Sequence, residues 1–262
     1  MNTRRPIISS SKLVDKGSFY KNTTIYCIGY GIFLQYIVAI EKVNKLQRTS
    51  IFSKPIFQAA IVSFFLMAII LPVRSQENNQ VYELSEVNFV DRAFVFNYSL
   101  ELDVASDFTQ YAAFLSPGLL FISAELDELP GIALAYGTAS LLSLAARFGL
   151  KELVDRPRPY MYFSDPPQTE IAKGKQLDSF PSGHAIMAFS GAAFTVTVFQ
   201  LKYRKSQYKL AANLAACGLA VATAGLRIAS GSHFFSDVLA GAILGSVIGS
   251  GTALLAYKLD LL

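Results

Sequence analysis

Three short stretches of the sequence contain an unusual concentration of side chains that can bind and attack a phosphoryl group. They are residues 151–159, 180–184 and 227–237. Both histidines of the 262-residue chain lie in these stretches. A single charged residue at a helix end often serves only as a membrane anchor. Three cations, two histidines and a carboxylate instead indicate a functional site, provided that the fold brings them together.

Five of these residues have the properties of a phosphate-binding cradle. Lys151, Arg158 and Arg227 can neutralise phosphoryl oxygens, and each arginine can bind two oxygens at once. Ser182 and Gly183 begin an expected helix, so its free backbone N–H groups and positive dipole end face the same anion. Gly183 lets the backbone approach closely, and Ser182 adds a hydroxyl donor.

The remaining three residues can supply the catalytic groups. His233 and Asp237 are four residues apart, so they share one face of a helix. In that arrangement the carboxylate of Asp237 can hold one imidazole nitrogen and direct the other at phosphorus, which makes His233 the expected nucleophile. His184, whose ordinary pKa is near neutral, can protonate the leaving oxygen and later activate water.

Metal binding is the competing use of histidine and aspartate, and the composition of the site disfavours it. Only two histidines and one carboxylate are available, and they stand among three cations that would repel a metal ion. The net charge of +4 is modest and no basic run alternates with aromatic residues, so nucleic acid is not an expected partner. We therefore expect a reaction that needs no metal ion or other cofactor.

The elements that carry these residues are expected to be membrane helices. Apolar residues make up 52% of the chain and charged residues only 16%, whereas a soluble domain carries about 25% charged residues. Several apolar stretches approach the roughly 20 residues that cross a bilayer. They are residues 56–73, 109–124, 130–150, 184–201, 210–226 and 237–257. The sequence predicts an all-α polytopic bundle of about six transmembrane helices, the second of them kinked at Ser116-Pro117-Gly118.

Basic residues set the expected orientation of this bundle, because lysine and arginine favour the cytoplasmic side. Lys42, Lys45, Arg48 and Lys54 precede the first predicted helix, and residues 202–209 form the other dense basic loop. With both loops inside, the three chemical stretches lie on the outer face. We expect a multi-pass protein of the inner (cytoplasmic) membrane whose site faces the periplasm or the outside.

The chain divides into three expected parts. Residues 1–55 are an N-terminal extension, cytoplasmic or interfacial. Residues 56–75 are either the first transmembrane helix or a signal segment, because the apolar run ends in a small-residue cleavage pattern. Residues 76–262 form the domain that carries the chemistry. Within it, the apolar spacing of residues 81–107 predicts an amphipathic helix along the membrane surface.

The order and spacing of the three stretches resemble the signature of the type 2 phosphatidic acid phosphatase superfamily, in its membrane-embedded branch. The matching residues are Lys151 and Arg158-Pro159, then Pro181-Ser182-Gly183-His184, then Arg227, His233 and Asp237. Leu226 stands where the family usually has serine, next to the site. Arg156 is an additional arginine, for which a contact with substrate stays open. The resemblance covers roughly residues 90–257.

This resemblance implies a mechanism and a class of substrate. His233 would form a phosphohistidine, Asp237 would orient it, and His184 would act as the general acid. Lys151, Arg158, Ser182, Gly183 and Arg227 would form the phosphate cradle. Members of the family hydrolyse phosphate monoesters and pyrophosphates, commonly on lipids. Phosphatidate, phosphatidylglycerol phosphate, undecaprenyl pyrophosphate and lipid A are the substrates it suggests.

Two other functions fit parts of the pattern. A vanadate-dependent haloperoxidase-like enzyme uses the same constellation, but such enzymes are soluble, which the apolar helices disfavour. A non-enzymatic protein that binds or transports a lipid phosphate would need the cradle only, and the presence of both His233 and Asp237 disfavours this alternative.

Gly241, Gly245 and Gly249 recur at every fourth position of the last predicted helix. A stripe of small residues lets another helix approach closely. The partner is expected to be a helix of the same bundle, although the stripe also allows a homodimer.

Overall fold

The computed structural model describes residues 82–262, and this part of the chain is helical, without strands. The expected extension 1–55 and the segment 56–75 lie outside the described residues. Five long helices make up most of the fold: α4 (Leu100–Phe114), α5 (Leu129–Leu153), α7 (Gly183–Leu201), α8 (Lys209–Ala229) and α9 (Phe235–Lys258). Short elements connect them: η2 (Leu84–Glu86), α3 (Phe89–Arg92), η3 (Ser116–Ile122), η4 (Pro159–Tyr162) and α6 (Gln168–Ala172).

Four of the described helices, α5, α7, α8 and α9, are long and apolar enough to cross a membrane. The outward faces of α5, α8 and α9 carry large exposed apolar side chains, as lipid-facing surfaces do. Examples are Leu141, Phe148, Leu214, Val221, Ile243 and Val247. These features confirm the prediction of an all-α, multi-pass membrane bundle. The structure does not establish the expected number of six helices, because the first predicted one lies outside residues 82–262.

The second predicted helix differs from the expectation in its position. Residues 109–124 do not form one helix: α4 begins already at Leu100 and ends at Phe114, and Pro117 lies in the 3-10 turn η3. Proline cannot continue the hydrogen bonding of an α-helix, so the break falls where the sequence predicted a kink. The start at Leu100 follows from Ser99, whose hydroxyl caps the helix by accepting a hydrogen bond from the Leu102 N–H at 3.3 Å.

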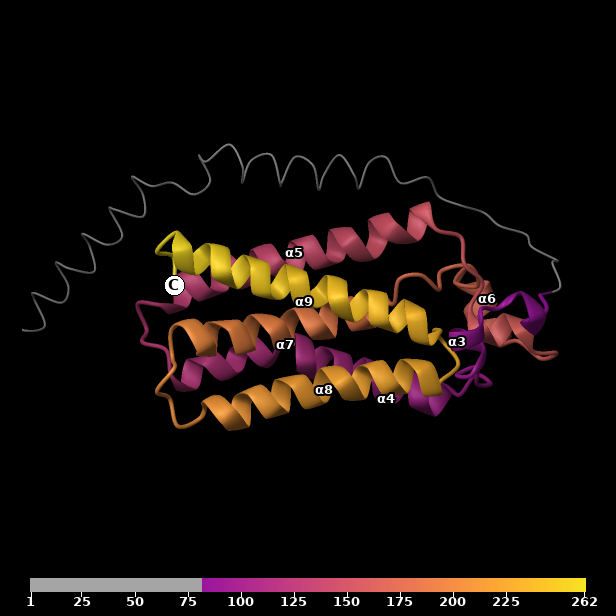
Figure 1. Cartoon of the computed structure of the whole chain (residues 1–262), viewed down its shortest axis with the longest axis horizontal. Helices are drawn as coiled ribbons and strands as arrows, with labels where there is room; N and C mark the ends of the chain where they lie inside the picture. Colours follow the sequence, from indigo (N-terminus) through magenta and orange to yellow (C-terminus); the bar gives the residue numbers. More distant parts are fainter. Residues whose placement is uncertain (1–81) are drawn as a thin grey trace, which may run out of the picture. The chain divides into compact units, whose positions relative to one another are not determined.

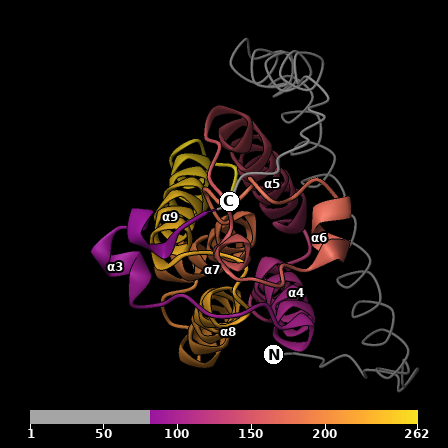
Figure 2. The same cartoon turned by 90° about the vertical axis from the view of Figure 1, so that its right-hand side faces the viewer.

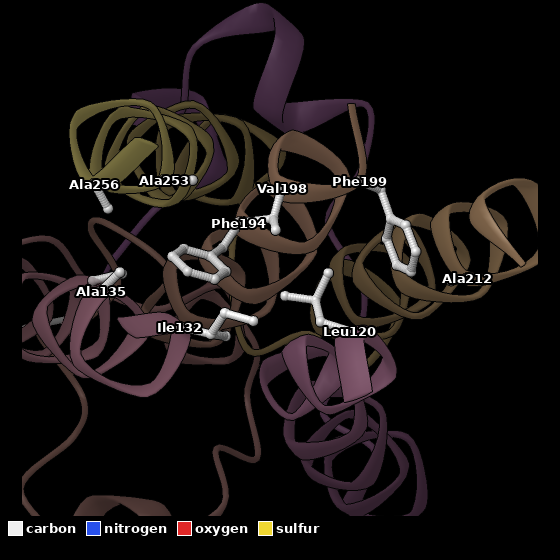
Figure 3. Packing of buried hydrophobic residues seen from close by; sticks show 10 residues of the cluster. Leu120, Ile132, Ala135, Phe194, Val198, Phe199, Ala212, Ala253 and Ala256 are labelled. Carbon is white, nitrogen blue, oxygen red and sulfur yellow. The ribbon is translucent and has the colours of Figure 1, made fainter. Parts of the chain in front are cut away.

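Helix α7 lies at the centre of the bundle. Figure 2 shows it surrounded by α4, α5, α8 and α9, and it packs against each of them. In its most apolar window 61% of the residues are buried, against 22–28% in the other three candidate spans. Figure 3 shows Phe194 and Val198 of α7 packed among Ala253 of α9, Ile132 of α5 and Leu120 of η3. The core therefore forms around α7, and residues 180–184, the second of the three stretches, lie at the start of this helix.

The glycine stripe of α9 faces α7 of the same chain. A methyl group added at Gly241, Gly245 or Gly249 would overlap a backbone carbonyl oxygen of the segment 182–190. All three glycines are buried there. The expected packing within the bundle is therefore confirmed. The same face is not free for the homodimer that the sequence also allowed, because α7 already covers it.

The amphipathic surface helix expected within residues 81–107 is not formed. This segment contains only η2 and the four-residue α3 before α4 begins. Asn88 caps α3, and Arg92 donates hydrogen bonds of 2.8 Å to the carbonyl oxygens of Ser85 and Val87. These local contacts fold the chain back on itself, so that the buried side chain of Asp91 reaches α9.

Candidate active site

The ends of four long helices bring the predicted site residues to one end of the bundle, the end that carries α3 and α6 in Figure 1. Lys151 lies in the last turn of α5, and Arg227 in the last turn of α8. Ser182 caps the start of α7, and Asp237 lies in the first turn of α9. The N–H of Ser182 donates to the carbonyl oxygen of Asp237 at 3.0 Å, which joins the starts of α7 and α9 directly.

Arg158 comes from the loop after α5, and backbone hydrogen bonds hold this loop against the segment before α7. The N–H of Arg158 donates to the Gln176 carbonyl at 2.9 Å, and the N–H of Arg156 donates to that of Leu177 at 3.0 Å. In return the Ser179 N–H donates to the Arg156 carbonyl at 3.1 Å. These bonds thus join the first motif, residues 151–159, to the segment that directly precedes the second, residues 180–184.

His233 is fully buried between α8 and α9, and its ring has one free nitrogen. Its Nδ1 lies 2.7 Å from the carbonyl oxygen of Ser179, which can only accept, so Nδ1 carries the proton. Its Nε2 has no hydrogen-bond partner among the described residues. Burial lowers the pKa of His233, and the charges of Arg158 and Arg227 lower it further, well below its ordinary value. The imidazole is therefore neutral, with an available lone pair on Nε2.

Asp237 does not hold the His233 ring directly, as its spacing of four residues had suggested. Its Oδ2 lies 3.9 Å from Nδ1, beyond hydrogen-bonding distance. That oxygen instead accepts from the Phe234 N–H at 2.9 Å and from the Ser179 hydroxyl at 2.6 Å. The carboxylate is occupied by the start of α9, where free N–H groups need an acceptor. Ser179 connects the two residues, because its hydroxyl binds Asp237 and its carbonyl binds His233.

Arg156 has a structural position rather than a place in the substrate cavity. Its guanidinium donates to the carboxylates of Asp237 and Asp91, the latter at 2.7 Å, and it stacks 4.4 Å from the ring centroid of Phe234. Burial alone would lower the pKa of Arg156, but the two carboxylates raise it above its ordinary value. Burial would raise the pKa of Asp91, but hydrogen bonds from Ser236 and Arg156 hold it below its ordinary value. Arg156 and Asp91 are therefore both ionised.

Arg227 and Arg158 are almost completely buried, with 2% and 4% of their surface exposed. One Nη of Arg227 donates to Asp103 at 2.5 Å and to the Ser106 hydroxyl at 3.0 Å. The Nε atoms of both arginines have no partner among the described residues. Buried polar groups are normally hydrogen-bonded. The two arginines are close enough for their charges to act on His233, so their unpaired nitrogens and its unpaired Nε2 are suited to an anion.

His184 lies in the first turn of α7 and contacts a residue that the sequence had not indicated. Its Nε2 lies 2.6 Å from Oδ1 of Asp107 on α4. Asp103, one turn earlier on α4, is the partner of Arg227 and of the Ser232 hydroxyl. The spacing Asp103-x3-Asp107 at the start of an apolar helix was the signal that could have revealed both, because such residues share one helix face.

A cavity of about 310 Å³ lies between α4, α5 and the start of α7, with the α6 region at its rim. Four of the predicted site residues line it: Lys151, Arg158, His184 and Arg227. His233 does not, since it is fully buried. Its Nε2 can therefore be reached from the cavity only if the surrounding side chains move. A second cavity, of about 660 Å³, lies around residues 202–208 at the other end of the bundle and contains none of the predicted site residues.

Ser182 and Gly183 are buried at the start of α7, directly before His184, which lines the 310 Å³ cavity. A side chain at Gly183 would overlap that of Arg147, which also lines the cavity. In the part of the chain that the structure describes, no three His, Cys, Asp or Glu side chains gather as metal ligands. The site is thus a set of cations and imidazoles at the end of the bundle, suited to a phosphoryl group.

Comparisons with known proteins agree with this description. The model of the PAP2 superfamily matches residues 132–260, a range that includes all the predicted site residues. Among solved structures, LpxE of Aquifex aeolicus is 22% identical with a TM-score of 0.41, over 68% of this chain and 99% of that one. The first transmembrane PAP2 type phosphatidylglycerolphosphate phosphatase from Bacillus subtilis is 22% identical with a TM-score of 0.43, over 77% and 94%. No curated protein matches the chain significantly.

Proposed function

Because this chain belongs to the PAP2 superfamily through residues 132–260, we propose that it hydrolyses a lipid phosphate monoester or pyrophosphate through a phosphohistidine on His233. One observation carries this proposal. The Nε2 atom of His233 is unpaired and unprotonated, and unpaired nitrogens of two buried arginines lie in the same site. A nucleophile with cations around its target is what phosphoryl transfer requires.

The first step forms the bond between Nε2 of His233 and phosphorus. As that bond forms, the bond between phosphorus and the leaving oxygen breaks, and its electron pair goes to the leaving oxygen. His184 gives this oxygen a proton. The carbonyl of Ser179 keeps accepting from Nδ1–H of His233, so the ring becomes a phosphorylated cation without losing its orientation. Lys151, Arg158 and Arg227 stabilise the charge on the other phosphoryl oxygens.

The second step returns the enzyme to its starting state. His184, now neutral, takes a proton from a water molecule whose oxygen attacks phosphorus. The bond between phosphorus and Nε2 of His233 breaks, and its electron pair returns to Nε2. Inorganic phosphate leaves, and both imidazoles recover their initial protonation.

The surroundings of the cavity support a lipid substrate. Its lining includes Leu100 and Val104 of α4 and Phe148 of α5, each 43–58% exposed. Helices α4 and α5 both pack on α7 but not extensively on each other. An apolar chain can therefore lie against these side chains in the membrane while its phosphate enters the charged end of the cavity. A water-soluble phosphate ester has no apolar chain that could contact these side chains.

The test is phosphate release by the purified protein in detergent or vesicles. We expect His233→Ala to lower the turnover of phosphatidate by about a thousandfold or more, because the covalent intermediate cannot form. Lys205→Ala, at the other end of the bundle, is the control that should keep full activity. Acid-labile labelling of wild type from a ³²P-labelled lipid, absent in His233→Ala, would identify the intermediate. Full activity of His233→Ala would refute the assignment of the nucleophile.

The same assay distinguishes the candidate substrates. Release rates are compared for phosphatidate, phosphatidylglycerol phosphate, undecaprenyl pyrophosphate and lipid A in identical vesicles. The substrate with the highest kcat/KM is the one whose headgroup the rim of the cavity fits. Residues 160–178, which include α6 and part of the rim, are the segment we expect to decide this preference.

A further inference from the structure

Helix α4 contributes two carboxylates, one helical turn apart, to the side of the cavity. Asp103 pairs with Arg227, and Asp107 pairs with His184. The whole of α4 lies before the region that matches the family model, which begins at residue 132. We propose that Asp107 is a positioning residue for the proton transfer: it fixes the ring of His184 so that Nδ1 delivers the proton to the leaving oxygen. This inference rests on the proposed function.

The geometry decides which nitrogen of His184 can act. Nε2 lies 2.6 Å from Oδ1 of Asp107, and a carboxylate can only accept, so Nε2 carries a proton. Among residues 82–262, none forms a hydrogen bond with Nδ1. His184 also lines the cavity. Nδ1 is therefore the nitrogen that is available to a bound phosphate ester.

Charge explains why His184 needs a carboxylate. Arg147, Lys151 and Arg227 line the same cavity and oppose a positive charge on its imidazole. A general acid at this position must carry a proton on each nitrogen, one to keep the bond to Asp107 and one to give from Nδ1. The carboxylate of Asp107 partly counteracts these cations and so favours the imidazolium, the form that acts as the acid.

The two carboxylates of α4 differ in how far they are tied into the fold. Asp103 binds Arg227 and the Ser232 hydroxyl, so its loss would disturb the loop before α9. The side chain of Asp107 is 47% exposed, and His184 is the residue to which it is hydrogen-bonded in the described part of the chain. Removing its charge should therefore leave the fold intact, which makes a functional test possible.

The test compares two substrates that differ in how strongly their leaving group needs a proton. In phosphatidate the departing alkoxide needs a proton, whereas in p-nitrophenyl phosphate the departing phenolate is stable without one. We expect Asp107→Asn to lower kcat/KM for phosphatidate by about tenfold to a hundredfold and to change kcat/KM for p-nitrophenyl phosphate by less than about threefold, because kcat/KM does not depend on the later hydrolysis of the phosphohistidine. Asp107→Glu should recover part of the loss. Glu101→Gln removes an exposed carboxylate from the same helix and should have no effect.

His184→Gln is the benchmark, because it removes the acid itself. Its loss should show the same dependence on the leaving group, and be larger. If Asp107→Asn reduces both substrates equally, or neither, while His184→Gln keeps the dependence, then Asp107 has no role in the proton transfer and the proposed function stands. If the wild-type protein releases phosphate from neither substrate, the proposed function and this inference both fail.

Discussion

The unpaired Nε2 of His233 belongs to a ring whose orientation is fixed by hydrogen-bonded neighbours. Ser179 is central to this arrangement: its carbonyl fixes the imidazole, and its hydroxyl binds the carboxylate of Asp237. Arg156 then holds Asp237 and Asp91 together from the other side. Such a chain of buried, satisfied polar groups orients a catalytic side chain rigidly. The imidazole ring of His233 is therefore already oriented, and only the side chains that cover it need to move.

The protonation state of His233 can be measured directly. Because burial and the neighbouring cations lower its pKa, the ring stays neutral as the pH falls through about 6.5, where a free histidine becomes half protonated. We expect its ¹³Cε1 resonance in histidine-labelled protein not to titrate between about pH 7.5 and 5.5. The chain has only two histidines, so His184→Gln leaves a single signal and assigns it.

This measurement requires a purification tag without histidine. A titration of the His233 resonance with a midpoint at or above that of free histidine would contradict the buried, neutral nucleophile.

At the level of elements, the contact between α7 and α9 positions the residues at the starts of both helices. The buried glycine stripe of α9 lets the two backbones approach closely, and the Ser182–Asp237 backbone hydrogen bond joins their starts. Gly245 is the middle of this contact: an added Cβ there would overlap the Ile186 carbonyl. Gly251 lies on the same helix, and an added Cβ there would meet nothing within 4 Å.

These two glycines give a matched pair of substitutions. We expect Gly245→Ala to destabilise the protein by about 1–3 kcal/mol, because the methyl group forces α9 away from α7. Gly251→Ala should be neutral or slightly stabilising, since alanine favours a helix more than glycine does. Thermal unfolding in detergent, followed by circular dichroism, measures both. Equal stability of the two variants would show that the close contact between α7 and α9 contributes nothing.

The sequence predicted the four long apolar helices to within a few residues, because a run of apolar residues of membrane length has few other uses. It misplaced α4, whose first turns contain Asp103 and Asp107 and so do not read as a membrane helix. The same two residues, with Ser179 and Asp91, were missed in the site. Their contacts join residues more than 50 positions apart. The spacing Asp103-x3-Asp107 indicates a shared helix face but not the partners of these two residues.

At the scale of the whole molecule, the two ends of the bundle differ in chemistry. One end holds the imidazoles and buried arginines, and the other holds the basic loop between α7 and α8, which includes Lys205. Helix α7 connects the two, so a single membrane crossing separates them. The positive-inside rule then assigns the basic loop to the cytoplasm. We propose that the active site faces the periplasm or the outside.

Cysteine labelling tests this orientation. Cys27 and Cys217 are first replaced by serine, and a single cysteine is then introduced at Lys205 or at Gln168, both exposed. In intact cells or spheroplasts a membrane-impermeant maleimide should modify Gln168→Cys but not Lys205→Cys. Permeabilised cells provide the control, because both sites should then react. Labelling of both positions, or of Lys205→Cys alone, from the outside would overturn the proposed orientation.

The close packing of α7 and α9 has a consequence for how the protein responds to the thickness of its bilayer. His184 stands on α7, and His233 directly precedes α9, so both reacting groups belong to one stiff unit at the middle of the bundle. When a bilayer thins or thickens, the resulting elastic strain tilts lipid-facing helices such as α9, and α7 moves with α9 because their backbones are in close contact. The distance between His184 and His233 should therefore change little with the thickness of the bilayer. A change in acyl-chain length should affect substrate binding far more than the chemical steps.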